Sequence, residues 1–342
     1  MKSENDTEEP SMQKIRIAQI GTGHPHSTGA AQTILENPEM ECIGFAKVTP
    51  DYIHPEHRHY LAPGQPYTRM REYTVDQLLE MDLDAVAIEC EEEKSTEYAQ
   101  MFAERGVHIF LDKPGTHGIA SFDKLAETCR SRNLVLKPAY MYRYNPLVQK
   151  AREIALSGAL GEIYAVEGQM SLYYPESMCR WIGKHKGGMM YYLGCHMVDL
   201  VLQFMGGLPE EIIPMNASTG QYGCDSENYG FAVLKYPKGV SFVKTSCEEA
   251  NGYNRRQLVI CGTGGTIEIK PMEGGPVNAM KAHAVITVDG KTERVESEPF
   301  DRYAPMMQDF VNHVLGRNEN PWDYDYEKAL FRTVMACCGW TE

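Results

Sequence analysis

The chain has 342 residues, of which 43% are hydrophobic and 23% charged, which is typical of a globular protein divided into two domains. Its formal net charge of −14 argues against nucleic acids and anionic membranes as partners, and no apolar run approaches the ~20 residues of a spanning helix. Ten cysteines in a chain of this size favour free thiols in the reducing cytoplasm over a disulfide framework.

Residues 1–12 are polar and acidic, without the apolar core of a signal peptide or membrane anchor, so we expect a disordered tail there. From 13 to 138, short apolar segments alternate with segments of helix formers. The expected strands are 15–20, 41–46, 84–89, 107–111 and 134–137, and the expected helices are 27–37, 74–80, 95–105 and 121–132. This alternation predicts a doubly wound parallel sheet of the Rossmann type.

The pattern changes in the second part of the chain, 139–342, where longer alternating segments follow one another. The expected strands are 163–172, 229–235, 240–246, 257–261, 266–269 and 284–288, and the expected helices are 147–157, 189–205, 303–315 and 326–338. Turn residues at 237–239 and 289–290 predict an α+β domain with a large, mostly antiparallel sheet. The loops 48–68 and 173–186 have no pattern that predicts regular structure.

Gly21-Thr22-Gly23 lies between the first strand and the first helix, where glycines let the backbone approach a pyrophosphate at a helix N-terminus. The third small residue of the Rossmann fingerprint is replaced by His26. His24 and His26 are therefore candidates for bonds to the pyrophosphate or the substrate. A metal site would need further ligands, and His54, His57 and His59 come with no supporting spacing, so we predict no metal.

Three more strand ends on this edge of the sheet offer cofactor contacts. The acid that usually grips the adenosine ribose is missing after the second strand, and Lys47 stands there instead. Lys47 would suit the 2′-phosphate of NADP, but it is equally a solvated lysine, so NAD and NADP both stay open. Glu89 and Asp112 end the next strands, and we count both among the cofactor contacts.

Lys113 follows Asp112 and precedes Pro114, which favours an extended backbone at the edge that faces the ligand crevice. A desolvated lysine beside a nicotinamide could exchange a proton with a substrate hydroxyl; the alternative is an ordinary loop lysine. On the expected helix 189–205, Tyr192, His196 and Asp199 would share one face. Such polar groups are expensive to bury without a purpose, although a structural stripe is the alternative.

Taken together, these segments resemble the Gfo/Idh/MocA oxidoreductase family over nearly the whole chain. The matching motifs are IGTG at 20–23, DAVAIE at 84–89, AERGVHIFLDKP at 103–114, YRYNP at 142–146, SGALGEI at 157–163, KGGMMYYLGCHMVD at 186–199 and CGTGGTIEI at 261–269. The resemblance implies a Rossmann domain, a second α/β domain for substrate and oligomer contacts, and homodimers or homotetramers. It also implies that Lys113 and His196 are catalytic and that Asp199 is the aspartate of the catalytic helix. Tyr192 replaces an aspartate usual in the family, which alters the proton chemistry.

The leading hypothesis is hydride transfer between NAD or NADP and a ring carbon of a sugar, inositol or glycoside. Lys113 would be the main acid or base, and His196 and Tyr192 would orient or share the proton. Tyr142, Arg143, Trp181 and Asp199 would contact the substrate. One alternative is cleavage or elimination assisted by the cofactor without net redox change. Another is a cofactor-sensing protein without activity.

Overall fold

The computed structural model describes residues 14–48, 60–276 and 279–340. The predicted tail 1–12 and the histidines at 54, 57 and 59 lie outside these residues. The first domain is built on sheet A, whose six parallel strands have the order β3-β2-β1-β4-β5-β6. These strands are β1 (Ile15–Ile20), β2 (Met40–Ala46), β3 (Glu72–Tyr73), β4 (Ala85–Ile88), β5 (His108–Leu111) and β6 (Leu136–Pro138). This is the Rossmann strand order, with the ligand crevice at the switch point between β1 and β4.

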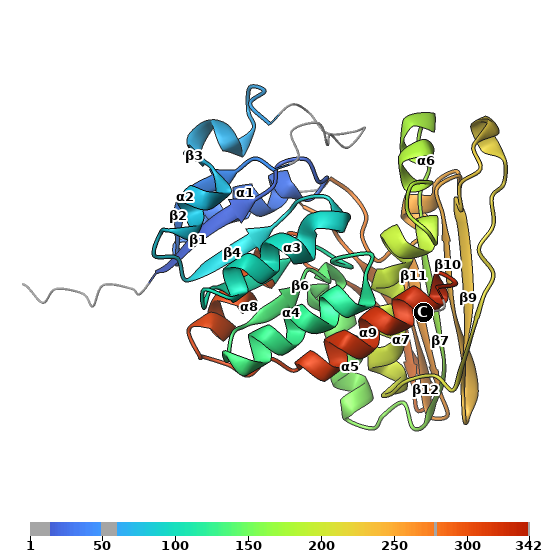
Figure 1. Ribbon diagram of the computed structural model, residues 1–342. Coiled ribbons are helices and arrows are strands. Elements are labelled where there is room, and N and C mark those ends of the chain that lie inside the picture. Colours follow the sequence, from blue (N-terminus) through green and yellow to red (C-terminus); the bar gives the residue numbers. More distant parts are fainter. Residues whose placement is uncertain (1–13, 49–59, 277–278, 341–342) are drawn as a thin grey trace, which may run out of the picture.

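Helices cover both faces of sheet A (Figure 1). They are α1 (Ser27–Glu36), the short α2 (Val75–Leu79), α3 (Glu92–Ala103) and α4 (Ile119–Ser131), joined by two helices from the end of the chain, α8 (Ala304–Val314) and α9 (Tyr324–Cys337). On one face, Phe331 of α9 stacks on Phe122 of α4 with ring centroids 4.7 Å apart. On the other, Phe310 of α8 packs with Ile15 and Ile17 of β1. The C-terminal helices therefore complete the core of the first domain, which the order of elements along the chain does not reveal.

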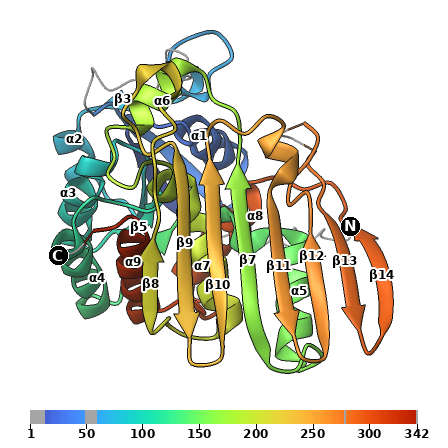
Figure 2. The same ribbon diagram turned by 90° about the vertical axis from the view of Figure 1, so that its right-hand side faces the viewer.

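Sheet B has eight strands in the order β14-β13-β12-β11-β7-β10-β9-β8, antiparallel except for the pair β7–β10. The strands are β7 (Ile163–Ser171), β8 (Glu211–Pro214), β9 (Tyr229–Tyr236), β10 (Gly239–Ser246), β11 (Gln257–Gly262), β12 (Gly265–Ile269), β13 (His283–Val288) and β14 (Lys291–Glu296). Helices α5 (Pro146–Leu156) and α7 (Cys195–Met205) cover one face, and Figure 2 looks onto the opposite face. The predicted fold class is confirmed.

Several short elements carry no sequence signal. These are β8, β14, the helix α6 (Glu176–Ile182) and the 3-10 turns η1 (Pro66–Arg69), η2 (Met141–Tyr144), η4 (Gln221–Gly223) and η5 (Gly252–Arg255). Strand β14 reads KTERVE and forms an edge of the sheet, where charged side chains are common because only one neighbour pairs with it. Its pairing with β13 follows the turn at Asp289 and Gly290, both with positive φ (51° and 73°).

The single helix predicted over 189–205 is interrupted. A π-helical turn, η3 (Met190–Gly194), precedes α7. The two glycines before it have positive φ and close neighbours. A Cβ added at Gly187 would lie 2.3 Å from Cys338 Cβ, and one added at Gly188 would lie 2.1 Å from the carbonyl oxygen of Glu227. They let this segment approach protein backbone, and the π-turn then changes the direction in which the side chains of 190–194 leave the helix.

Candidate active site

The glycine turn closes tightly against the end of β4. Gly21 has φ +98°, and an added Cβ would lie 2.5 Å from the carbonyl oxygen of Glu89. Only glycine fits there without moving the backbone. The turn leads into α1, whose first residues have no side-chain cap, so backbone N–H groups remain available to an anion. The turn of residues 21–23 thus fits a dinucleotide pyrophosphate.

The two histidines after the turn are bonded to protein groups. His24 is buried, with Nδ1 3.0 Å from Asp112 Oδ2 and Nε2 3.3 Å from Glu92 Oε1. Burial opposes a charge on this ring, but Asp112 and Glu92 outweigh it and raise the pKa of His24 to about 10. The side chain of His24 therefore belongs to the interior, and direct cofactor contact does not fit its surroundings.

His26 lies at the edge of the same group. Its Nδ1 is 2.7 Å from Asp112 Oδ1, and burial lowers its pKa to about 4, so the ring is neutral at pH 7. The side-chain ligand atoms of His24, His26 and Asp112 lie within 4.8 Å of one another, close enough to hold a metal ion. Hydrogen bonds within the group already use these atoms, and the prediction of no metal stays a prediction.

The other two expected cofactor contacts differ in burial. Glu89 is 1% exposed, and its Oε2 has no hydrogen-bond partner. Burial and the nearby Asp112 raise the pKa of Glu89 well above its usual range, which favours the protonated carboxyl over the charged form. Lys47 is half-exposed at the end of β2, with Nζ 3.3 Å from the Tyr60 hydroxyl and 3.8 Å from Glu72 Oε1.

Lys113 leaves the end of β5 and reaches across to the second domain. It is 1% exposed, and its Nζ donates a hydrogen bond of 2.6 Å to the carbonyl oxygen of Tyr192. The same ammonium lies 4.8 Å from the centre of the Tyr192 ring. The structure thus brings together two of the residues predicted as catalytic, 79 positions apart in the chain.

His196, in the first turn of α7, is the third. It is 1% exposed, and neither ring nitrogen has a hydrogen-bond partner. The rings of Tyr140 and Tyr142 meet it edge to face at 5.9 and 5.1 Å. Burial lowers the pKa of His196, and Lys113 and His26 lower it further, so the ring is neutral at pH 7. The residue before it, Cys195, has its Sγ 3.7 Å from the Tyr192 carbonyl oxygen that accepts the Lys113 hydrogen bond. Buried nitrogens without partners are costly, and they indicate a position completed by a ligand.

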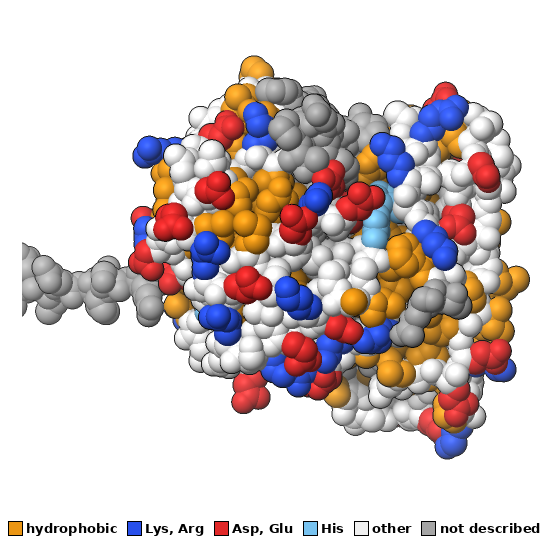
Figure 3. Space-filling view, viewed as in Figure 1, with side chains coloured by type: hydrophobic (Ala, Val, Ile, Leu, Met, Phe, Trp, Pro, Cys, Tyr) orange, Lys and Arg blue, Asp and Glu red, His pale blue; other side chains and the backbone are white. Residues whose placement is uncertain are grey.

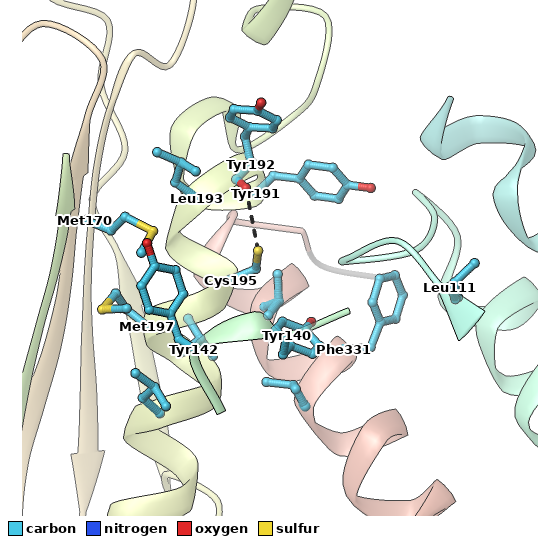
Figure 4. Close-up of a cluster of buried hydrophobic side chains, with 14 of the residues drawn as sticks. Leu111, Tyr140, Tyr142, Met170, Tyr191, Tyr192, Leu193, Cys195, Met197 and Phe331 are labelled. Carbon is cyan, nitrogen blue, oxygen red and sulfur yellow. Dashed lines mark hydrogen bonds between the residues drawn. The ribbon is translucent and has the colours of Figure 1, made fainter. Parts of the chain in front are cut away.

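Aromatic side chains enclose this position. Tyr191 and Tyr192 leave η3 in different directions, and Tyr142 lies lower, beside Met170 and Met197 (Figure 4). Cys195 Sγ lies 3.7 Å from the Tyr192 carbonyl oxygen. Trp181 of α6 meets the Tyr192 ring at 5.2 Å. The loop 173–186, which has no sequence pattern, therefore supplies part of the wall.

Two of the expected substrate contacts are turned to other partners. Arg143 is 4% exposed, and its guanidinium lies 2.8 Å from Asp199 Oδ1 and 2.6 Å from Glu327 Oε1. Asp199 also accepts hydrogen bonds of 2.9 Å from the Tyr326 hydroxyl and from Gln203. Their polar atoms are already used, so the substrate contact expected of Arg143 and Asp199 does not fit, and both serve to join α7 to α9.

Sequence reasoning missed the partners that hold the site residues. The Tyr142 hydroxyl donates to Glu273, which also binds Arg256 and Arg302. Glu92 holds His24. Both glutamates lie far along the chain from the residues they hold, and no spacing in the sequence links them.

Comparison with known proteins identifies the family to which the chain belongs. A family model described as "Oxidoreductase family, NAD-binding Rossmann fold" matches residues 15–140, and one described as "GFO/IDH/MocA C-terminal domain" matches residues 148–268. The chain belongs to the Gfo/Idh/MocA oxidoreductase family. It is an NAD(P)-dependent enzyme of that family, as its glycine turn and its sequence motifs predict.

Among Gfo/Idh/MocA relatives, the chain is 26% identical to D-xylose 1-dehydrogenase (NADP(+)) 2 of Haloferax volcanii over 76% of this chain and 78% of that protein. It is 22% identical to 2,7-anhydro-N-acetylneuraminate hydratase of Mediterraneibacter gnavus over 62% of this chain and 56% of that protein. The solved structure of UDP-N-acetylglucosamine 3-dehydrogenase GnnA from Acidithiobacillus ferrooxidans has the same fold, with a TM-score of 0.77 at 19% identity, and covers 96% of this chain and 98% of that one. Within the described residues, no helix is long and apolar enough to cross a membrane.

Proposed function

We propose that this protein catalyses reversible hydride transfer between NAD(P) and a hydroxyl-bearing ring carbon of a sugar, inositol or glycoside. The observation that carries the proposal is the buried His196 with two unpartnered ring nitrogens. It follows Cys195, whose Sγ lies 3.7 Å from the Tyr192 carbonyl oxygen to which the buried Lys113 donates. The name of the xylose dehydrogenase relative supports the substrate class. Aromatic walls formed by Trp181 and Tyr192 support it too, because such rings suit the faces of a sugar.

Each residue of the site would have a separate role in this reaction. The turn at 21–23 and Glu89 would hold the dinucleotide, whose nicotinamide supplies the hydride acceptor or donor when bound. In the oxidative direction Lys113 would act as the neutral amine: it would exchange its bond to the Tyr192 carbonyl for one to the substrate hydroxyl and take the proton of that hydroxyl. The neutral His196 would orient that hydroxyl by a hydrogen bond. Tyr192 would line the pocket where relatives have an aspartate, and Tyr142 would fix the His196 ring.

The test is a panel of free sugars, inositols and nucleotide sugars with NAD and with NADP, read by the absorbance of the reduced cofactor. We expect turnover with at least one compound. Lys113→Ala should lower kcat by about 10²–10⁴-fold, the usual contribution of a positioned acid or base. The matched control is Lys124→Ala, an exposed lysine on α4, which should leave kcat unchanged. Equal rates in both variants would refute the role of Lys113.

A second candidate function is cleavage, hydration or elimination without net redox change. It is favoured by the relative named as a hydratase, because adding or removing water leaves no net change in oxidation state. Product formation by enzyme that retains its cofactor, with no added NAD(P) and no accumulated reduced cofactor, would establish it. Turnover that strictly requires added cofactor would exclude it.

The assembly proposed here is a homodimer or homotetramer formed through the open face of sheet B. Phe231 and Phe242 stack on each other at 5.6 Å across β9 and β10, and Val240 is 50% exposed. Apolar side chains on a face without covering helices favour self-association. Light scattering should give a dimer or tetramer mass, and Phe242→Lys should dissociate the oligomer.

The ten free thiols support action in a reducing cytoplasm.

A further inference from the structure

Two arginines share a single carboxylate beside the first residues of β11. We call Arg256, Arg302 and Glu273 the guanidinium cluster. Arg302 Nη2 lies 2.9 Å from Glu273 Oε2, and Arg256 Nη1 bonds Glu273 Oε1. The side chains of Arg256 and Glu273 are 5% and 2% exposed, and that of Arg302 is 17% exposed. The cluster therefore holds two positive charges and one negative charge largely away from water.

No second carboxylate balances the guanidinium cluster. Within the described residues, neither arginine forms an ion pair with any carboxylate other than Glu273. Glu249 is already shared by two other cations, Lys244 at 3.1 Å and Arg255. Asp301, next to the second arginine in the chain, accepts backbone N–H bonds at the start of α8. One positive charge is left over, although charges that are buried normally have a partner.

Arg256 also has donor groups to spare. Its Nε lies 3.4 Å from the carbonyl oxygen of Ser171, and its Nη1 lies 3.1 Å from the Tyr142 hydroxyl. Its Nη2 makes no hydrogen bond within the part of the chain that the structure describes. The Tyr253 ring packs against the guanidinium, with 4.2 Å between the ring centre and the central carbon. A planar, oriented guanidinium with a free nitrogen is suited to bind a carboxylate or a phosphate.

The guanidinium cluster adjoins the proposed active site on two sides. The Tyr142 hydroxyl bonds two members of the cluster, and its ring meets the ring of His196 at 5.1 Å. Tyr303, the residue after the second arginine, meets the ring of His26 at 6.1 Å. The cluster is therefore one side chain away from His196, whose ring nitrogens have no partners.

The exterior of the protein gives no reason for a surplus positive charge at this position. The chain has a formal net charge of −14. On the face drawn in Figure 3, acidic and basic side chains are mixed over the surface of both domains. Attraction by the whole protein therefore does not favour an anionic ligand, and the preference has to come from the buried cluster itself.

We propose that the guanidinium cluster binds an anionic group of the substrate, the carboxylate of a sugar acid or the phosphate of a sugar phosphate. The anion supplies the missing negative charge, and its oxygens accept hydrogen bonds from the free nitrogen of Arg256. The reacting hydroxyl of the same molecule then lies at His196, across the Tyr142 ring. The inference rests on the proposed function, because it names the substrate class of that site.

The test measures binding separately from turnover. Calorimetry on enzyme saturated with NADH or NADPH, which prevents oxidation of the sugar, compares glucuronate with glucose and galacturonate with galactose. Glucose 6-phosphate is the third anionic probe. At least one anionic sugar should bind with a Kd about tenfold to a hundredfold lower than that of its neutral parent, the range of a hydrogen bond to a charged group. The probe with the lowest Kd identifies the group as a carboxylate or a phosphate.

Two variants change the charge of the cluster in opposite directions. Arg302→Met leaves one cation for one carboxylate, so the anionic sugar should lose its advantage over the neutral parent. Glu273→Gln leaves two cations without a carboxylate, so the advantage should persist or increase. Arg294→Met, an exposed arginine on β14, is the matched control and should keep the wild-type ratio of the two Kd values.

The inference is overturned if no anionic sugar binds more tightly than its neutral parent, or if Arg302→Met keeps the wild-type ratio. Loss of the advantage in both cluster variants would overturn it too, because it would indicate a structural role. Turnover of a neutral sugar without any preference for anions would reject the inference and leave the proposed function intact. Binding of an anionic sugar that depends on Arg302, without reduction of cofactor by any sugar, would support the anion site and refute the proposed function.

Discussion

Helix α7 carries two buried polar residues three positions apart that have opposite surroundings. Asp199 lies against Arg143 and accepts further bonds from Tyr326 and Gln203. His196 has aromatic neighbours and no partner on either nitrogen. The cost of burying Asp199 is offset by its partners, whereas at His196 the cost remains in the free protein. Asp199 therefore holds the fold together, whereas His196 is left for a ligand.

The largest effect should follow from breaking the partnered cluster. Arg143→Met leaves Asp199 and Glu327 as buried carboxylates without their cation, so the free energy of unfolding should fall by about 3–5 kcal/mol. Thermal or urea unfolding measures it. Arg105→Met, an exposed arginine at the end of α3, is the control and should change stability little. Equal stability of the two variants would mean that the cluster does not hold α7 to α9.

At His196 we expect the opposite: a large loss of activity with little change in stability. His196→Asn should lower kcat by about 10²-fold or more, because the ring orients the reacting hydroxyl. The melting temperature should change little, since the ring has no hydrogen bond to lose. Steady-state kinetics and calorimetry on the same sample test both parts. A large fall in stability with normal kcat would place His196 with Asp199 among the structural residues.

The buried cluster of His24, Asp112 and Glu92 makes the stability of the protein depend on pH. The pKa of His24 is raised from 6.5 to about 10, so its contribution to stability is complete below pH 6.5 and is lost as the pH rises toward 10. Between these values the free energy of unfolding should fall by about 1.4 kcal/mol per pH unit more in the wild-type protein than in His24→Gln. The pKa of Glu92 is lowered from 4.5 to about 2, so its contribution is lost below pH 4.5. Urea unfolding at a series of pH values measures the difference in slope; parallel curves would contradict it.

The smallest effect concerns Lys47, which is half-exposed and already near Tyr60 and Glu72. If it meets the 2′-phosphate of NADP, Lys47→Ala should weaken NADP binding by about fivefold, which is the range of an exposed charge pair, and leave NAD binding unchanged. Titration calorimetry with both cofactors tests this. An equal loss of affinity for NAD and for NADP would show that Lys47 does not contact the 2′-phosphate.

Much of the fold could be predicted because local patterns agree with it. Strand 15–20 matches β1 residue for residue, and the helix expected over 147–157 lies one residue from α5. The helix over 189–205 was only partly right, since helical spacing does not reveal a π-turn. Lys113, Tyr192 and His196 are candidates from spacing and resemblance, and in the structure Lys113 bonds the Tyr192 carbonyl oxygen, which Cys195, the neighbour of His196, also meets. Arg143 and Asp199 looked equally functional, because a sequence does not show which polar residues find partners.

The parallel sheet, the glycine turn and the placement of Lys113 at a strand end can be predicted from local patterns, because each depends on residues that are neighbours in the chain. Which buried charges are neutralised depends on contacts that form when the chain folds. Glu327 meets Arg143, and Glu92 meets His24, after the chain has folded back across both domains. Electrostatic and hydrogen-bond energies depend on distance and burial, and neither is set by position in the sequence.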